Sequence, residues 1–86
     1  MKIVIFGLSI TSSWGNGHAT TFRALTRALH LRGHRILFFE KDVEWYGSNR
    51  DMPEPPFCEV KLYQTWADIV HIVRRELDDA DIAMAG

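Results

Sequence analysis

The spacing of hydrophobic positions changes along the chain in the order strand, helix, strand. Residues 3–6 are an apolar run without alternation, which is typical of a strand buried on both faces of a parallel sheet. Residues 19–32 follow with helical spacing, and residues 36–39 are a second short apolar run. The pattern therefore predicts a βαβ unit over residues 2–40, with a right-handed crossover and parallel strands.

The predicted first helix has one apolar stripe and one polar side. Its apolar positions are Phe22, Leu25, Ala28, Leu29 and, near the end, Leu31. Arg23, Thr26, Arg27 and His30 occupy the other side, and Gly33 stands where a helix commonly ends in a left-handed residue. We expect this helix to cover one face of the sheet and to end before Gly33.

After residue 40 the chain is predicted to leave the sheet and then return to it. Residues 42–56 are polar, aromatic and proline-rich, which indicates a surface excursion. Residues 58–63 alternate between apolar and other side chains, which predicts a half-exposed edge strand. A variant of the capping box at 65–68 precedes a second amphipathic helix, and residues 82–86 are expected to form a fourth strand that enters the core. The expected core positions of the second helix are Trp66, Ile69, Val70, Val73 and Leu77, and its expected polar face is His71, Arg74, Arg75 and Glu76.

These elements predict an α/β fold, with a small parallel sheet of about four strands in the order 3-2-1-4 and helices on its faces. In that order the topological switch point lies beside the first strand, and ligands bind beyond the carboxyl ends of the strands. Because the fourth strand has no element after it, we interpret residues 1–86 as the N-terminal part of a Rossmann-like domain in a longer protein.

Composition narrows the class of protein without identifying it. With 10 Lys and Arg against 11 Asp and Glu, the formal net charge of −1 offers no basic field for nucleic acid or an anionic membrane. Cys58 is the only cysteine, which excludes an internal disulfide and favours a reducing compartment. The apolar run after Met1 is too short for a membrane helix, and His30, His34 and His71 lack metal-ligand spacing. We therefore expect a cytoplasmic protein with no membrane insertion, no bound metal and no nucleic-acid partner.

The stretch from Ser12 to Thr20 carries the candidate chemistry. It is long for a connection between a strand and a helix. Gly15 and Gly17 let a ligand approach the backbone, and Asn16 tolerates a left-handed conformation. Because the N-terminus of the following helix favours negative charge, this stretch suits an anionic or hydroxyl-rich ligand.

One interpretation of this stretch is a dinucleotide site for NAD or FAD. The run from Gly15 to Thr20 matches G-x-G-x-x-G except at its last position, and Glu40 ends the second strand where a ribose-binding carboxylate would lie. Two features disagree. The glycines begin eight residues after Gly7, and Thr20 replaces the glycine that allows the helix to pack closely.

The same residues resemble the start of GT-B-type glycosyltransferases. Trp14-Gly15-Asn16-Gly17-His18-Ala19-Thr20 is followed by A-L-T-R-A-L over 24–29 and by R-G-H over 32–34. That family begins with a strand, a G-x-G-H or G-G-H loop, an A-L-x-x-A-L helix and R-G-H before the second strand. The residues at 40–46 and 49–51 are similar to bacterial transferases of the spore-maturation type.

The resemblance implies an enzyme in which this part of the chain holds the acceptor. The nucleotide-sugar donor would bind a C-terminal domain that these 86 residues do not contain, so the chain alone is expected to be inactive. The family resembled needs no metal or other cofactor. Where a member uses a histidine base, it lies in the loop after the first strand, and His18 matches that position. Imidazole titrates near neutrality and can take a proton from an acceptor hydroxyl.

Each candidate residue also has a simpler interpretation. His18 is either this base or a helix-start histidine bonded to a neighbouring loop, and Thr20 and Thr21 either contact the ligand or cap the helix. Trp14 either stacks on the acceptor or closes the crevice, and Glu40 is either a ligand group or a solvated strand end. A further alternative for the chain is a non-catalytic module that self-associates through an unpaired sheet edge or an exposed apolar face.

Overall fold

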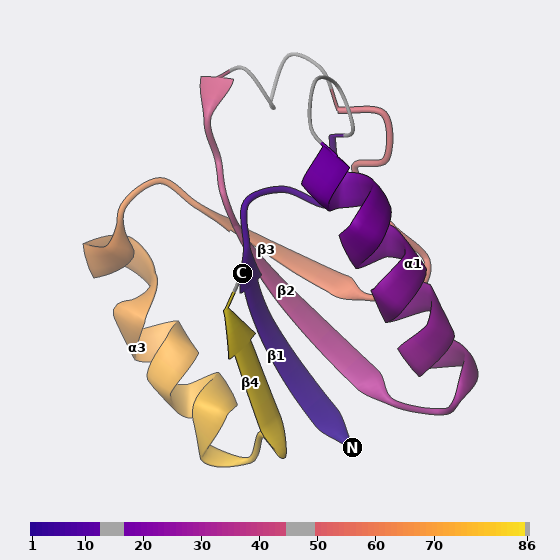
Figure 1. The fold of residues 1–86 in the computed structure, drawn as a ribbon. Helices are drawn as coiled ribbons and strands as arrows, with labels where there is room; N and C mark the ends of the chain where they lie inside the picture. The colour runs from indigo at the N-terminus through magenta and orange to yellow at the C-terminus, as the bar shows by residue number, and fades with distance from the viewer. Residues whose placement is uncertain (13–16, 45–49, 86) are drawn as a thin grey trace.

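A computed structural model describes residues 1–12, 17–44 and 50–85 as an α/β unit with a four-stranded parallel sheet (Figure 1). The strands lie in the order β3-β2-β1-β4 and every pairing is parallel, so the predicted fold class and strand order are confirmed. The elements in chain order are β1 (Lys2–Gly7), α1 (Gly17–Leu31), β2 (Arg35–Lys41), β3 (Glu59–Tyr63), α3 (Trp66–Asp78) and β4 (Ile82–Ala85).

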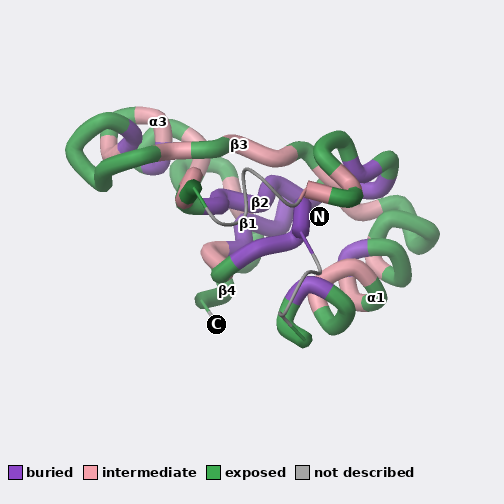
Figure 2. Tube along the Cα trace, turned by 90° about the horizontal axis from the view of Figure 1, so that it is seen from above, coloured by how far each residue is buried: buried purple, intermediate pink, exposed green. Residues whose placement is uncertain are grey.

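Helices α1 and α3 cover opposite faces of the sheet, as Figure 2 shows from above. The chain moves from β1 to β2 and β3 in one direction and then crosses back to β4, so right-handed crossovers place α1 and α3 on different sides. β1 pairs with β2 from Lys2 opposite Arg35 to Gly7 opposite Glu40, and on its other side it pairs with β4. The carboxyl ends of β1 and β2 are therefore level with each other at one edge of the sheet.

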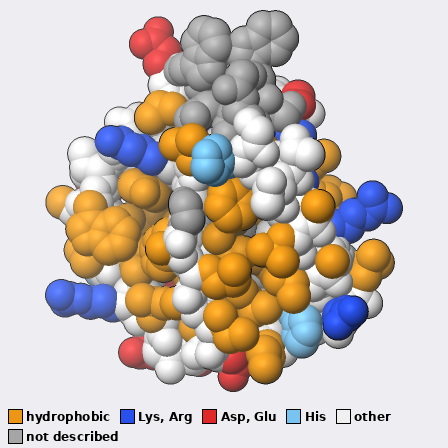
Figure 3. All heavy atoms as spheres, in the orientation of Figure 1, with side chains coloured by type: hydrophobic (Ala, Val, Ile, Leu, Met, Phe, Trp, Pro, Cys, Tyr) orange, Lys and Arg blue, Asp and Glu red, His pale blue; other side chains and the backbone are white. Residues whose placement is uncertain are grey.

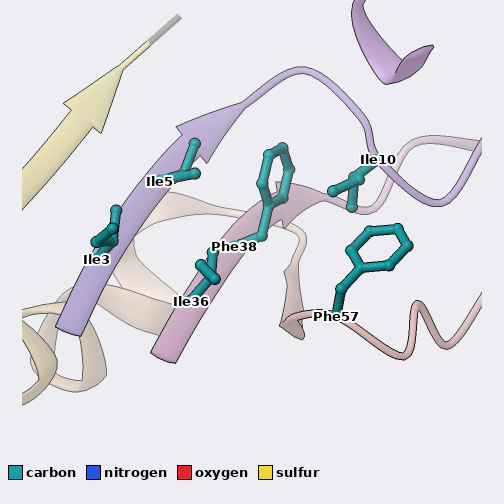
Figure 4. Close-up of a cluster of buried hydrophobic side chains, with 6 residues drawn as sticks. All are labelled: Ile3, Ile5, Ile10, Ile36, Phe38 and Phe57. Carbon is teal, nitrogen blue, oxygen red and sulfur yellow. The ribbon is translucent and has the colours of Figure 1, made fainter. Parts of the chain in front are cut away.

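The core consists of two layers, one on each face of the sheet. The layer under α1 contains Ile3, Ile5, Ile10, Ile36, Phe38 and Phe57 (Figure 4). The layer under α3 contains Val4, Leu37, Phe39, Ile69 and Val73. Successive residues of β1 and β2 thus point into different layers, which explains why both strands are apolar without alternation.

The helix faces differ in part from those predicted. On α1, Thr26 is fully buried and its hydroxyl donates to the carbonyl of Phe22 at 2.7 Å, whereas Leu31 is 75% exposed. The hydrogen bond within the helix satisfies the Thr26 hydroxyl, so this small polar side chain can be buried. Leu31 is the last residue of α1. On α3, Ile69 and Val73 are buried as expected, but Trp66 is 52% exposed and Glu76 forms an ion pair.

The ends of the helices agree with the sequence signals. Gly33 has a φ of 86°, the left-handed conformation predicted for the residue after α1, and its N–H donates to the carbonyl of His30 at 2.9 Å. At the start of α3, the backbone N–H of Thr65 donates to the Asp68 carboxylate at 3.3 Å, as in a capping box.

β4 is paired with β1 but does not enter the core, which corrects the expectation for this strand. All four of its residues are exposed, although the register places Ile82 beside Ile3 and Met84 beside Ile5 on the face that α1 covers. Figure 3 shows hydrophobic side chains gathered on this face of the molecule, between β4 and α1. The residues of β4 are as apolar as those of a buried strand. Whether they are buried depends on which other segments cover them, and the sequence of the strand does not specify this.

Lys2 joins the beginning of β1 to the end of α3. Its ammonium lies 2.8 Å from the Glu76 carboxylate and also bonds the Asp79 carboxylate and, at 2.8 Å, the carbonyl of Glu76. Its backbone N–H donates to Asp81 at 2.7 Å. Hydrogen bonding to Lys2 lowers the pKa of both Glu76 and Asp79, and the same two bonds raise the pKa of Lys2.

Gly7 is required because the ring of Phe38, on β2, and the ring of Phe22, on α1, approach the end of β1 closely. A Cβ at Gly7 would lie 2.5 Å from the ring of Phe38 and 2.8 Å from the ring of Phe22, whereas a Cβ at Gly17 would have no neighbour within 4 Å. We expect Gly7→Ala to lower the free energy of unfolding by about 1–3 kcal/mol through overpacking. Gly17→Ala, the matched control, should change it by less than about 0.5 kcal/mol. Urea unfolding of both variants measures this, and equal destabilisation would contradict the close approach.

Acid should weaken the fold through Glu76 and Asp79. Because their folded-state pKa values are lowered, their stabilisation is complete above the ordinary carboxyl pKa of about 4 and is lost as the pH falls through the lowered values. The urea midpoint should therefore fall between about pH 5 and pH 3, and less steeply in Lys2→Met than in the parent chain. Lys41→Met serves as the control. Identical pH profiles for Lys2→Met and the parent would show that Lys2 does not hold these pKa values.

Candidate functional site

The segment that follows β1 turns back into the molecule instead of lying on its surface. Ser9, Ile10 and Ser12 have no exposed area and Thr11 is 1% exposed. Ser9 closes a local turn, since its hydroxyl oxygen accepts the N–H of Ser12 at 3.2 Å. A buried loop must satisfy its backbone polar groups inside the protein, so its remaining partners have to come from other elements.

Glu40, at the end of β2, supplies the main partner. One oxygen of its carboxylate accepts the backbone N–H groups of Ile10 at 2.7 Å and of Thr11 at 3.0 Å, and the other accepts the Thr11 hydroxyl at 2.6 Å. Glu40 has no exposed area. The interpretation of Glu40 as a solvated strand end is therefore wrong, because the loop after β1 brings its N–H donors to this carboxylate. Its oxygens hold the loop and have no surface with which to contact a ligand.

Arg50 completes a polar network around this carboxylate. Its Nε–H donates to the Thr11 hydroxyl oxygen at 2.9 Å, and its terminal nitrogen lies 2.8 Å from Asp42 and 3.6 Å from Glu40. The carbonyl of Thr11 in turn accepts the N–H of Met52 at 2.9 Å. The excursion after β2 is thus tied to the loop after β1, and a cation lies near the buried negative charge, as burial of a carboxylate requires.

Arg23 attaches α1 to the same loop. Its Nε–H donates to the carbonyl of Ile10 at 2.8 Å, and its guanidinium binds Asp51 through two nitrogens at 2.7 and 3.3 Å. The sequence predicted Arg23 on the polar side of the helix, and it did not predict that Thr11 and Arg50 would interact with Glu40. The available signal was a glutamate directly after an apolar run, with arginines before and after it in the chain.

The predicted ligand-binding residues divide into three groups. Gly17, His18, Thr20 and Thr21 form the exposed first turns of α1, at the edge where β1 and β2 end. The Thr21 hydroxyl lies 3.5 Å from the carbonyl of Gly17, so it bonds within the helix and does not cap it. Glu40 lies inside the protein. Trp14, Gly15 and Asn16 lie outside the described residues.

Burial, with smaller contributions from Glu40 and Glu59, raises the pKa of the Cys58 thiol to about 11, which makes it a weak nucleophile at neutral pH. Across residues 1–12, 17–44 and 50–85, no group of three or more His, Cys, Asp or Glu side chains is arranged to hold a metal ion. Within the same ranges, no helix has both the length and the apolar character needed to cross a bilayer.

The fold and the site together define an α/β chain with Rossmann-like strand order and a buried, polar-bonded loop after β1. No protein-family model matches the chain, and comparisons with curated proteins and with solved structures likewise find no match.

Glu40→Gln should destabilise the chain by about 2–4 kcal/mol. The amide keeps one acceptor oxygen, and its NH₂ group would replace the other. In one orientation the NH₂ would face the N–H groups of Ile10 and Thr11, and in the other it would face the Thr11 hydroxyl and Arg50. Amide hydrogen exchange should quicken at Ile10 and Thr11 more than elsewhere. Glu54→Gln, on an exposed residue, is the matched control. Unchanged exchange at Ile10 and Thr11 would contradict the role of Glu40 in holding the loop.

Proposed function

We propose that this chain is the N-terminal, acceptor-side part of a GT-B-type glycosyltransferase. The whole protein would move a sugar from a nucleotide-sugar donor to an acceptor hydroxyl. The observation that carries the proposal is the exposed first turn of α1 at the carboxyl edge of β1, with His18 on it. The sequence resemblance over residues 14–36 supports the same class of enzyme.

The described residues suit an acceptor for three reasons. The edge lies next to the switch point between β1 and β4, where open α/β sheets bind ligands. The N-terminus of α1 favours an oxygen that develops negative charge. The loop after β1 is held by hydrogen bonds to Glu40, Arg23 and Arg50. This part of the proposed site is therefore positioned before a ligand binds.

In the proposed reaction His18 acts as the general base. A ring nitrogen takes the proton of the acceptor hydroxyl while its oxygen forms a bond to the anomeric carbon of the donor sugar. The bond from that carbon to the donor phosphate breaks, and the nucleotide leaves with the electron pair. The donor domain would supply the groups that bind the nucleotide.

The structure weakens the dinucleotide alternative. In a dinucleotide site, a carboxylate at the end of the second strand binds the ribose hydroxyls. Glu40 occupies that position, but both of its oxygens accept hydrogen bonds from the loop after β1 and neither is exposed.

The test uses the protein encoded by the complete reading frame. Incubated with nucleotide sugars, it should release nucleotide by transfer or hydrolysis, and His18→Ala should lower kcat by about 10²–10⁴-fold, the usual contribution of a general base. His30→Ala, in the last turn of α1, is the matched control and should keep full activity.

Unchanged turnover in His18→Ala would remove this residue from the catalytic role. Failure of every nucleotide sugar to react in the parent protein would refute the transferase proposal itself, provided that the protein is folded by circular dichroism.

A further inference from the structure

A hollow lies at the carboxyl ends of the strands, on the face of the sheet that α3 covers. Its volume is about 350 Å³ and it is lined by Phe6, Gly7, Leu8, Lys41 and Tyr63. These residues come from the ends of three adjacent strands and from the residue that follows β1. Phe6 and Tyr63 pack against the core layer under α3, so this hollow and His18 belong to opposite faces of the sheet.

The aromatic side chains that line this hollow are Phe6 and Tyr63, and Trp66 packs next to both. The Trp66 ring lies 6.1 Å from that of Phe6 and 6.3 Å from that of Tyr63, in tilted and edge-to-face arrangements, and Phe6 stacks on Phe39 at 5.2 Å. These contacts join Phe6, Tyr63 and Trp66 into one aromatic cluster beside the hollow. Nevertheless, Trp66 is 52% exposed and Leu8 is 46% exposed. Large apolar side chains left exposed beside a hollow are typical of a binding site.

Lys41 supplies the polar group of the hollow. It is the last residue of β2 and the register partner of Tyr63, and its side chain is exposed. No acidic side chain of the described residues lies within ion-pair distance of Lys41, whereas Lys2 is held by Glu76 and Asp79. Its ammonium can therefore bind an anion without first breaking an ion pair.

We propose that this hollow binds a small ring that carries a phosphate monoester. The flat or apolar face of the ring would lie against Trp66 and Tyr63, and the phosphate would pair with Lys41. Aromatic walls favour such ring faces, and a lysine binds phosphate as a point charge. The site is separate from His18 and its occupancy does not depend on glycosyl transfer.

The experiment is a ¹H–¹⁵N NMR titration of the 86-residue chain with three probes: phenyl phosphate, glucose 1-phosphate and inorganic phosphate. The indole N–H signal of Trp66, identified by its loss in Trp66→Phe, should shift with phenyl phosphate, with glucose 1-phosphate or with both. Inorganic phosphate should bind at least about tenfold more weakly, because it lacks a ring to stack. The probe that binds more tightly shows whether an aryl or a sugar ring is preferred.

Four variants locate the site. Trp66→Ala should weaken binding of the better probe at least about tenfold, and Lys41→Gln about fivefold or more, since each removes one of the two contacts. Lys61→Gln, on the neighbouring strand and outside the hollow, is the matched control for charge and should bind as the parent does. His18→Ala should also bind as the parent does, which keeps this proposal distinguishable from the proposed catalysis.

Equal binding of inorganic phosphate and the ring-bearing probes would overturn the proposal, as would unchanged affinity in Lys41→Gln, or no shift of the Trp66 indole at tens of millimolar probe. Because Lys41 is exposed, its variant tests the site even if Trp66→Ala unfolds α3.

Discussion

Burying a carboxylate is unfavourable unless hydrogen bonds and a nearby cation compensate for the lost water, and at Glu40 the compensation comes from two separate segments. The loop after β1 donates three hydrogen bonds, Arg50 brings the positive charge, and Arg50 in turn holds Asp42. The carboxyl edge of the sheet takes its shape from this arrangement. Without it, the loop after β1 would have two buried N–H groups and no acceptor for them.

The residues that hold the loop after β1 in place are different from the residues proposed to bind ligands. The charged groups that fix the edge are buried or half-buried, whereas the groups proposed to meet ligands, His18 on α1 and Lys41 with Trp66 on the other face, are exposed. β1 lies between the two places and is covered on both faces by the core. A central strand buried in this way can carry two ligand positions at its end without either one disturbing the packing below.

Most of the fold could be predicted from the sequence because its signals are local. The apolar runs of β1 and β2, the glycine after α1 and the capping box of α3 each depend on neighbouring residues, and all are found in the structure. The burial of Glu40 and Thr26 and the exposure of Leu31 and Trp66 could not be predicted in this way. They depend on where a helix or loop lies over the sheet, which a residue's own spacing does not specify. The same holds for β4, whose composition resembles a core strand.

The distance along the chain between Glu40 and its partners has a consequence for folding kinetics. The carboxylate lies 30 residues after Ile10 and 29 after Thr11, and a contact of such sequence separation forms only after the intervening chain has closed. The loop after β1 can therefore take its native shape only when α1 has crossed over and β2 has paired with β1. This end of the sheet is therefore expected to form late, whereas the helix within the βαβ unit can begin to form from local contacts alone.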